Sequence, residues 1–181
     1  MIIKSFKVFY SNLRINEELE TETTDQKVQK EESQKELDSL QKQLSEFNSK
    51  FKSKIEQLYS TTENDVEISQ EIENLMPEEK NKFAVDWMRV CRLEKEIRGL
   101  VNKRDSKKDK KEELIDRKEL NKNDPQSLQN LEVKIKQNED DSKTIITTLA
   151  EKEKELKQAQ NDHQKLMDEA KQELEDIKKE I

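Results

Sequence analysis

Residues 125–170 read PQSLQNLEVKIKQNEDDSKTIITTLAEKEKELKQAQNDHQKLMDEA, and this stretch determines the fold class. From Leu128 onward, steps of three and four residues alternate for six heptads, which is the spacing of a coiled-coil seam. A helix over 125–181 would be about 85 Å long at 1.5 Å per residue. Such a helix cannot bury its seam alone, so it needs a neighbouring segment or another chain. The seam comprises Leu128, Leu131, Ile135, Asn138, Ser142, Ile145, Leu149, Lys152, Leu156, Ala159, His163, Leu166 and Ala170.

Four members of this seam are polar: Asn138, Ser142, Lys152 and His163. Polar residues at seam positions lower stability but select one register and one partner. The large apolar members are the residues that we expect to contact the partner. This predicted partner seam comprises Leu128, Leu131, Ile135, Ile145, Leu149, Leu156 and Leu166.

Helix-breaking residues are rare in the rest of the chain, which has 181 residues, one glycine and two prolines. Pro and Gly are the strongest breaks in regular structure. The sequence therefore predicts an all-α, elongated coiled coil of about three long helices, broken near Pro77 and Pro125. Asp124 before Pro125 is a good N-cap. The predicted segments are 1–13, 14–75 with a break near 60–64, 77–122 and 125–181.

The segment 14–75 has its own seam from Leu37 to Leu58, again in steps of three and four. The seam stops at residues 60–63, where Ser60 and Glu63 fit a capping box that would restart a helix. Glu78 and Glu79 after Pro77 suit the first turn of the next helix, because the helix dipole favours negative charge there. The predicted seam comprises Leu37, Leu40, Leu44, Phe47, Phe51, Ile55 and Leu58, and the restarted helix presents Ile68, Ile72 and Leu75.

The segment 83–101 has the broadest apolar stripe, and a stripe of this width indicates packing against more than one neighbour. Gly99 lies within it and would permit a close helix contact, although glycine in a helix costs about 1 kcal/mol relative to alanine. Cys91 in this stripe is interpreted as a small apolar residue. The stripe comprises Phe83, Ala84, Trp87, Met88, Val90, Cys91, Ile97, Leu100 and Val101.

Composition leaves two interpretations open, because 43% of residues are charged and 30% are hydrophobic. Disorder has this signature, but regularly spaced apolar residues favour a helical assembly with a narrow seam. The net charge of −7 is uneven, since residues 80–122 carry 15 Lys or Arg and 9 Asp or Glu. This basic middle lies between acidic arms, which suggests intramolecular pairing or an anionic partner.

Six basic residues concentrate the positive charge of this middle segment: Lys103, Arg104, Lys107, Lys108, Lys110 and Lys111. They are either a solvated helix end, where charge occupies the seam, or a contact for an anionic membrane or an acidic protein. Nucleic acid is unlikely as a partner, because the cluster has no aromatic residue for base stacking.

No residues nominate a catalytic, cofactor or metal site. His163 is the only histidine and Cys91 the only cysteine, and one glycine cannot supply a phosphate-binding loop. We therefore expect no enzyme activity and no cofactor. The absence of a long apolar run and of a secretory signal predicts a cytoplasmic protein. Residues 1–13 form a basic amphipathic segment that would dock on the coiled coil or a partner, or lie on a membrane.

Two stretches, LQKQLSEFN at 40–48 and NDPQSLQNLEVKIKQNEDDSKTI at 123–145, resemble the long coiled-coil subunits of the intraflagellar transport B complex. That resemblance implies pairing with a sister subunit in a ciliary scaffold. The succession of an amphipathic start, three long helices and a basic tip resembles a BAR domain. This second resemblance implies a crescent dimer whose six clustered basic residues contact curved membrane.

We therefore expect a non-enzymatic coiled-coil scaffold that mediates protein–protein assembly, in a ciliary or cytoskeletal setting by resemblance. The alternative is a BAR-like protein that binds membrane through residues 1–13 and 103–111. The partner is either another coiled-coil protein or a second copy. Parallel pairing and folding back are both compatible with the seam, and the breaks at Pro77 and Pro125 favour folding back.

Overall fold

The computed structural model describes residues 28–76 and 81–180, and within them every regular element is a helix. The prediction of an all-α protein is confirmed for this part of the chain. The predicted amphipathic segment 1–13 and the turn at Pro77 lie outside the described residues. Two compact units divide the chain, one holding residues up to Glu46 together with those from Met167, the other spanning Phe47–Leu166.

The first unit contributes two helical stretches, residues 28–46 and the end of α5 (Pro125–Glu180). In the stretch 28–46 the predicted seam residues Leu37, Leu40 and Leu44 are buried. Ala170, near the end of α5, is buried as well. Both stretches therefore use apolar residues at helical spacing to exclude water.

The second unit begins with a π-helical turn, η1 (Phe47–Phe51), which runs into α2 (Lys52–Thr61). Phe47, Phe51, Ile55 and Tyr59 follow one another at steps of four and are all buried. A π-helical turn has more residues per turn than an α-helix, so it can absorb this shift of the apolar stripe. The buried stripe ends on Tyr59, and the predicted member Leu58 is only half-buried.

The break predicted near 60–64 is present, because α2 ends at Thr61 and α3 (Asp65–Leu75) begins after Asn64. The predicted capping box is wrong. Asn64 is the N-cap, and its side chain accepts a hydrogen bond from the Val66 amide at 3.0 Å. Ser60 Oγ instead donates to the Gln57 carbonyl, so it is not available to cap the new helix.

The helix predicted over 77–122 is α4 (Lys82–Leu120), and it starts later than expected. Asn81 has a non-helical backbone, and its side chain accepts hydrogen bonds from the Phe83 and Ala84 amides at 3.1 and 3.2 Å. An asparagine in this role satisfies amides that have no partner within the helix. The start of α4 is therefore fixed by Asn81.

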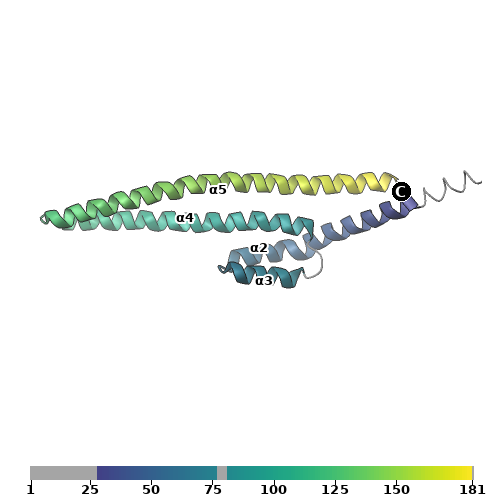
Figure 1. Ribbon diagram of the computed structural model, residues 1–181, viewed down its shortest axis with the longest axis horizontal. Helices are drawn as coiled ribbons and strands as arrows, with labels where there is room; N and C mark the ends of the chain where they lie inside the picture. Colours follow the sequence, from purple (N-terminus) through teal and green to yellow (C-terminus); the bar gives the residue numbers. More distant parts are fainter. Residues whose placement is uncertain (1–27, 77–80, 181) are drawn as a thin grey trace, which may run out of the picture. The chain divides into compact units, whose positions relative to one another are not determined.

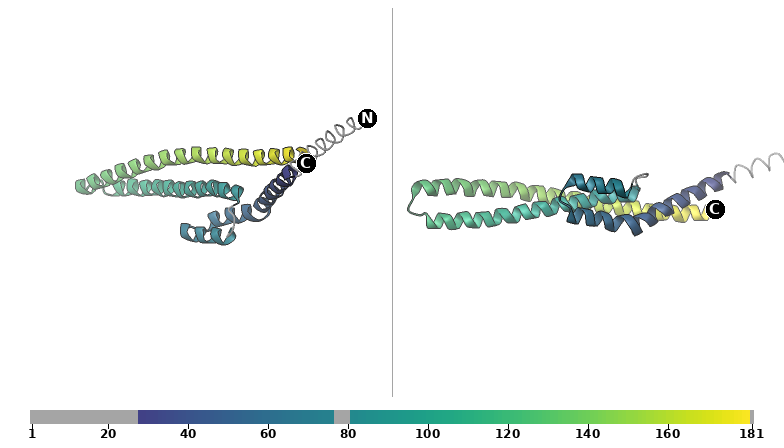
Figure 2. Two further views of the ribbon diagram at one scale, coloured as in Figure 1. Left: turned by 45° about the vertical axis from the view of Figure 1, so that its right-hand side comes forward. Right: turned by 90° about the horizontal axis from the view of Figure 1, so that it is seen from below.

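Helices α4 and α5 run antiparallel and side by side (Figures 1 and 2). Between them the chain turns at residues 121–124, where the Asp124 amide donates to the Asn121 carbonyl. Pro125 is the first residue of α5, and the Asp124 carboxylate accepts hydrogen bonds from the Gln126 and Ser127 amides. The cap predicted from the sequence is confirmed, and the chain folds back on itself.

The core of the second unit lies where α4 meets two neighbours. Phe83, Ala84, Val90 and Cys91 are almost completely buried. On one side α4 packs against η1 and α2, where the Phe47 and Phe83 ring centroids are 6.1 Å apart. On the other side a cluster of Val90, Leu93 and Ala159 joins α4 to α5. The prediction of more than one neighbour for this segment is confirmed.

Candidate functional site

Helix α4 carries a second heptad stripe, from Asp86 to Lys118, that faces α5. Its members recur at steps of three and four, and each is buried or half-buried. Sequence reasoning missed the stripe because half of its positions are charged and were counted as solvated surface. The spacing alone would have revealed it. The stripe comprises Asp86, Val90, Leu93, Ile97, Leu100, Arg104, Lys107, Lys111, Leu114 and Lys118.

Ion pairs join this stripe and its flanks to α5 along the length of the hairpin. Each pair is at least partly exposed to water, so solvent screens it and it contributes little stability by itself. All of these ion pairs require the same register of α4 against α5, because a shift of either helix by one turn would break every pair. The pairs are Arg89–Asp162 at 3.5 Å, Glu96–Lys152 at 3.0 Å, Lys107–Asp141 at 2.5 Å, Lys111–Glu139 at 2.8 Å and Lys118–Glu132 at 2.8 Å.

The ion pairs also change the titration of the groups that form them. The hydrogen bond from Lys111 holds the pKa of the Glu139 carboxyl below its usual value. Hydrogen bonds to Glu155 and to Glu96 raise the pKa of Lys152. Each shift favours the charged form, so these contacts persist at neutral pH. A fall in pH through the lowered pKa of Glu139 would remove its contribution to stability.

The polar members of the α5 seam have partners within the chain. Asn138 is 5% exposed and its side-chain amide donates to the Lys107 carbonyl at 2.8 Å. Lys152 pairs with Glu96, whereas Ser142 donates to the Asn138 carbonyl within its own helix. Buried polar groups are costly unless they are hydrogen-bonded. Asn138 and Lys152 therefore favour this register of α4 against α5.

The apolar members of the predicted partner seam pack within the hairpin. Leu131 and Leu149 are buried, and Leu156 contacts the cluster of Val90, Leu93 and Ala159. The remaining members of the seam are half-buried: Leu128, Ile135, Ile145 and Leu166. The neighbour that the seam requires is thus α4 of the same chain.

His163 lies in an aromatic cluster at the inner end of the hairpin. Its Nδ1 atom is 2.9 Å from Asp86 Oδ2, and its ring lies 4.8 Å from Trp87 and 5.4 Å from Phe47 between centroids. Lys52 of α2 lies over the Trp87 ring at 5.0 Å. The cluster thus joins η1, α2, α4 and α5, and its buried position at the seam identifies His163 as a packing residue.

The basic cluster is largely neutralised by nearby acids. Besides the two lysines that pair with α5, Arg104 pairs with Asp105 and Lys110 with Glu113. Within the described residues, Lys103 and Lys108 are exposed and form no ion pair. Residues 102–147, which form the far half of the hairpin, carry 12 Lys or Arg and 11 Asp or Glu. Three members of the cluster, Lys103, Lys108 and Lys110, are exposed, as expected of a solvated helix end, whereas Lys107 and Lys111 pair with acidic residues of α5.

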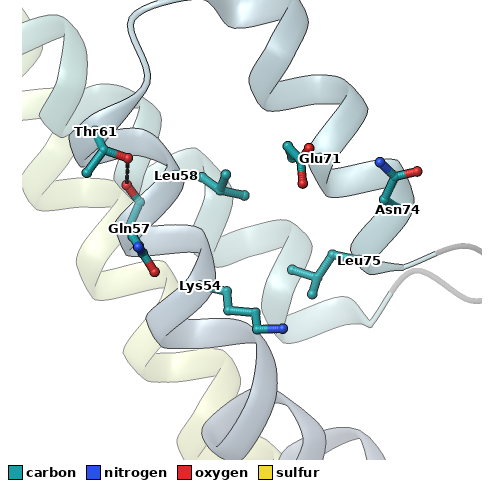
Figure 3. A pocket seen from close by; sticks show the side chains of 7 residues that line it. All are labelled: Lys54, Gln57, Leu58, Thr61, Glu71, Asn74 and Leu75. Atoms are coloured by element: carbon teal, nitrogen blue, oxygen red, sulfur yellow. Dashed lines mark hydrogen bonds between the residues drawn. The ribbon is translucent and has the colours of Figure 1, made fainter.

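A groove with a volume of about 410 Å³ separates α2 from α3. Leu58 and Leu75 point into it from opposite walls, with Lys54 and Glu71 nearby (Figure 3). On the α2 wall, Thr61 Oγ1 donates to the Gln57 carbonyl at 2.9 Å (Figure 3). The lining of the groove thus combines two apolar side chains with charged and polar ones.

Other chemistry in the described residues is sparse. Burial raises the pKa of the Cys91 thiol to about 12, so the sulfur stays protonated at neutral pH. No three His, Cys, Asp or Glu side chains of the described residues are grouped so that they could hold a metal ion. Among the described helices, none combines the length and apolar character needed to cross a bilayer.

Comparisons with known proteins identify no relative of this chain. No protein-family model matches it, no curated protein matches, and no solved structure matches. The resemblances to intraflagellar transport subunits and to BAR domains therefore remain predictions.

Proposed function

We propose that the protein is a non-enzymatic coiled-coil scaffold that mediates protein–protein assembly. The observation that carries this proposal is the register-locked pairing of α4 with α5. Because the two seams cover each other within one chain, the hairpin is ordered before any partner arrives. Preorganisation lowers the entropic cost of binding, which suits an element that holds other proteins at fixed positions.

The finer parts of the proposal rest on sequence. The architecture that we propose is an elongated coiled coil of about three long helices. Its basis is the heptads of α4 and α5, together with the seam that begins at Leu37. A ciliary or cytoskeletal setting in the cytoplasm follows from the resemblance of residues 40–48 and 123–145. The partner that we propose is a coiled-coil protein or a second copy of this chain.

Purification of the tagged full chain from its native cells tests the scaffold function. We expect a stoichiometric complex with other proteins that withstands detergent, because the contacts are between proteins. Leu149→Asp, which places a carboxylate in the seam, should release the partners, whereas Thr147→Asp on the exposed side of α5 should retain them. A tagged chain that is recovered without any other protein and sediments as a monomer would overturn the proposal.

The alternative function, binding of a membrane surface, is favoured by the side chains of Lys103 and Lys108, which are exposed and form no ion pair with residues 28–76 or 81–180. The near balance of charge in residues 102–147 weighs against it, because attraction to anionic lipid amounts to about 1 kcal/mol for each free basic residue. A protein scaffold needs no affinity for lipid, so the two proposed functions differ in whether the protein binds vesicles.

Sedimentation with phosphatidylserine–phosphatidylcholine vesicles at low salt separates these functions. We expect the wild-type protein to stay in the supernatant, and the double variant Lys103→Glu, Lys108→Glu to behave in the same way. The control variant Lys154→Glu, Lys157→Glu changes the charge of α5 by the same amount. Wild-type protein that sediments and is released only by the first double variant would establish membrane binding.

A further inference from the structure

The groove between α2 and α3 lies within one unit of the chain, and its walls come from two consecutive helices. Leu58 of α2 and Leu75 of α3 point into it from opposite sides (Figure 3), and both side chains are half-buried. The volume of about 410 Å³ falls within the range of about 300–1,000 Å³ that is usual for ligand pockets. The groove therefore has room for apolar side chains of another segment between the two leucines.

The helices that form this groove carry an excess of negative charge. Residues 52–75 contain two lysines and six acidic residues. On α3, Glu67, Glu71 and Glu73 are exposed and form no ion pair with residues 28–76 or 81–180. Lys54 supplies the basic group of the lining, and Glu71 offsets its charge. Because the far half of the hairpin is nearly balanced in charge, a basic segment is attracted to α3 more strongly than to that half.

The amino-terminal segment has the chemistry that such a groove requires. Residues 1–14 read MIIKSFKVFYSNLR and carry three basic residues and no acidic residue. The same stretch contains Phe6, Phe9 and Tyr10 among apolar residues that recur at helical spacing. Each aromatic side chain can bury about 150–250 Å² of surface. The segment lies outside the described residues, so the sequence alone supplies its properties.

The length of the intervening chain allows this segment to reach the groove. The residues that join Arg14 to Val28 extend to about 45 Å at about 3.3 Å per residue. From Val28 to Lys54 the chain is helical, and a helix of this length measures about 40 Å at 1.5 Å per residue. Because this is the contour length of the helix, it is an upper limit on the separation of its ends. The connection to the segment is therefore long enough.

We propose that residues 1–14 dock in the groove between α2 and α3 of the same chain. In this arrangement the aromatic side chains of the segment pack between Leu58 and Leu75. Its basic side chains lie near the carboxylates of α3. Apolar burial supplies the affinity, and the opposite charges favour this segment over acidic ones. The contact involves α2 and α3 alone and leaves the pairing of α4 with α5 unchanged, so the inference goes beyond the scaffold function.

The covalent connection favours the chain's own segment over other occupants. Two sites joined by a short tether meet at an effective concentration of the order of millimolar, so a contact of modest affinity is sufficient. A second copy does not have this advantage. Each copy also carries a net charge of −7, which opposes the approach of another copy.

Hydrogen–deuterium exchange of the full chain, followed by mass spectrometry, tests the inference. We expect the backbone amides of residues 1–14 to exchange more slowly than those of a synthetic peptide with the same sequence. Glu71→Lys should raise their exchange rate about two- to fivefold, because it replaces an attractive charge with a repulsive one. Leu58→Asn should raise the rate about tenfold, because it removes an apolar contact of the segment.

Glu153→Lys is the matched control for Glu71→Lys. Glu153 is exposed on α5 and forms no ion pair with residues 28–76 or 81–180, so we expect wild-type exchange. Glu71 is exposed as well, and its replacement should leave the helicity of the chain unchanged.

Three results would overturn the inference. In the first, residues 1–14 of the wild-type protein exchange as fast as the free peptide. In the second, both groove variants leave the slow exchange intact, which would place the segment elsewhere. In the third, the slow exchange develops only as the protein concentration rises, which would assign the contact to a second copy. None of these results contradicts the scaffold function, which the native complex tests separately.

Discussion

Replacing Phe47 with alanine is expected to lower the free energy of unfolding by about 3–5 kcal/mol, the usual cost of deleting a buried aromatic ring. Phe47 is 1% exposed, and its ring contacts Phe83 and Trp87 on α4 and His163 on α5. The substitution leaves a cavity where η1, α4 and α5 meet. Chemical denaturation followed by circular dichroism measures the loss.

Val66→Ala provides the comparison for Phe47→Ala. Val66 is exposed on α3, so its truncation should change the unfolding free energy by less than about 0.5 kcal/mol. Stability that falls by less than about 1 kcal/mol in Phe47→Ala would contradict the packing of η1 between α4 and α5. The expected loss is large because the ring joins segments that are distant in sequence.

Leu149→Asp is expected to destabilise the hairpin by at least about 3 kcal/mol, since it adds an unpaired buried carboxylate to the loss of the leucine contacts. Leu149 is 7% exposed and lies in the middle of the α5 seam. Because the seam pairs with α4 of the same chain, the loss should not depend on protein concentration. Thermal unfolding at several concentrations measures both quantities.

Thr147→Asp is the control for this substitution, because Thr147 is exposed two residues away on the same helix. It introduces the same charge and the same poor helix propensity without burial, so its effect should stay below about 1 kcal/mol. If Leu149→Asp instead produced a folded monomer from an oligomer, the seam would be shown to join separate chains.

Much of the hairpin could be predicted from local patterns. The period of the α5 seam and the Asp124–Pro125 start depend on residues within a few positions of one another. The breadth of the stripe in 83–101 likewise predicts packing against more than one neighbour. These features are local because helix periodicity and capping are properties of one segment.

Other features depended on contacts between distant segments. The charge pattern left open whether the basic segment pairs within the chain or with an anionic partner, and the structure pairs Lys107 and Lys111 with acidic residues 34 and 28 positions away. Gly99 was expected to permit a close helix contact, yet among the described residues no atom beyond its chain neighbours and its own helix backbone lies within 4 Å of a Cβ built there. The sequence predicted a helix start at Pro77, whereas α4 is capped by Asn81, a role that the sequence analysis did not assign to it.

The sequence by itself determined that the protein is helical, where α5 begins, and which face of α5 must be covered, because each of these follows from spacing along one segment. The tertiary structure decided that α4 of the same chain covers that face and in which register. Only the folded chain brings Lys107, Lys111 and Lys118 opposite Asp141, Glu139 and Glu132. Charge pairing between helices depends on distances through space, which a one-dimensional pattern does not contain.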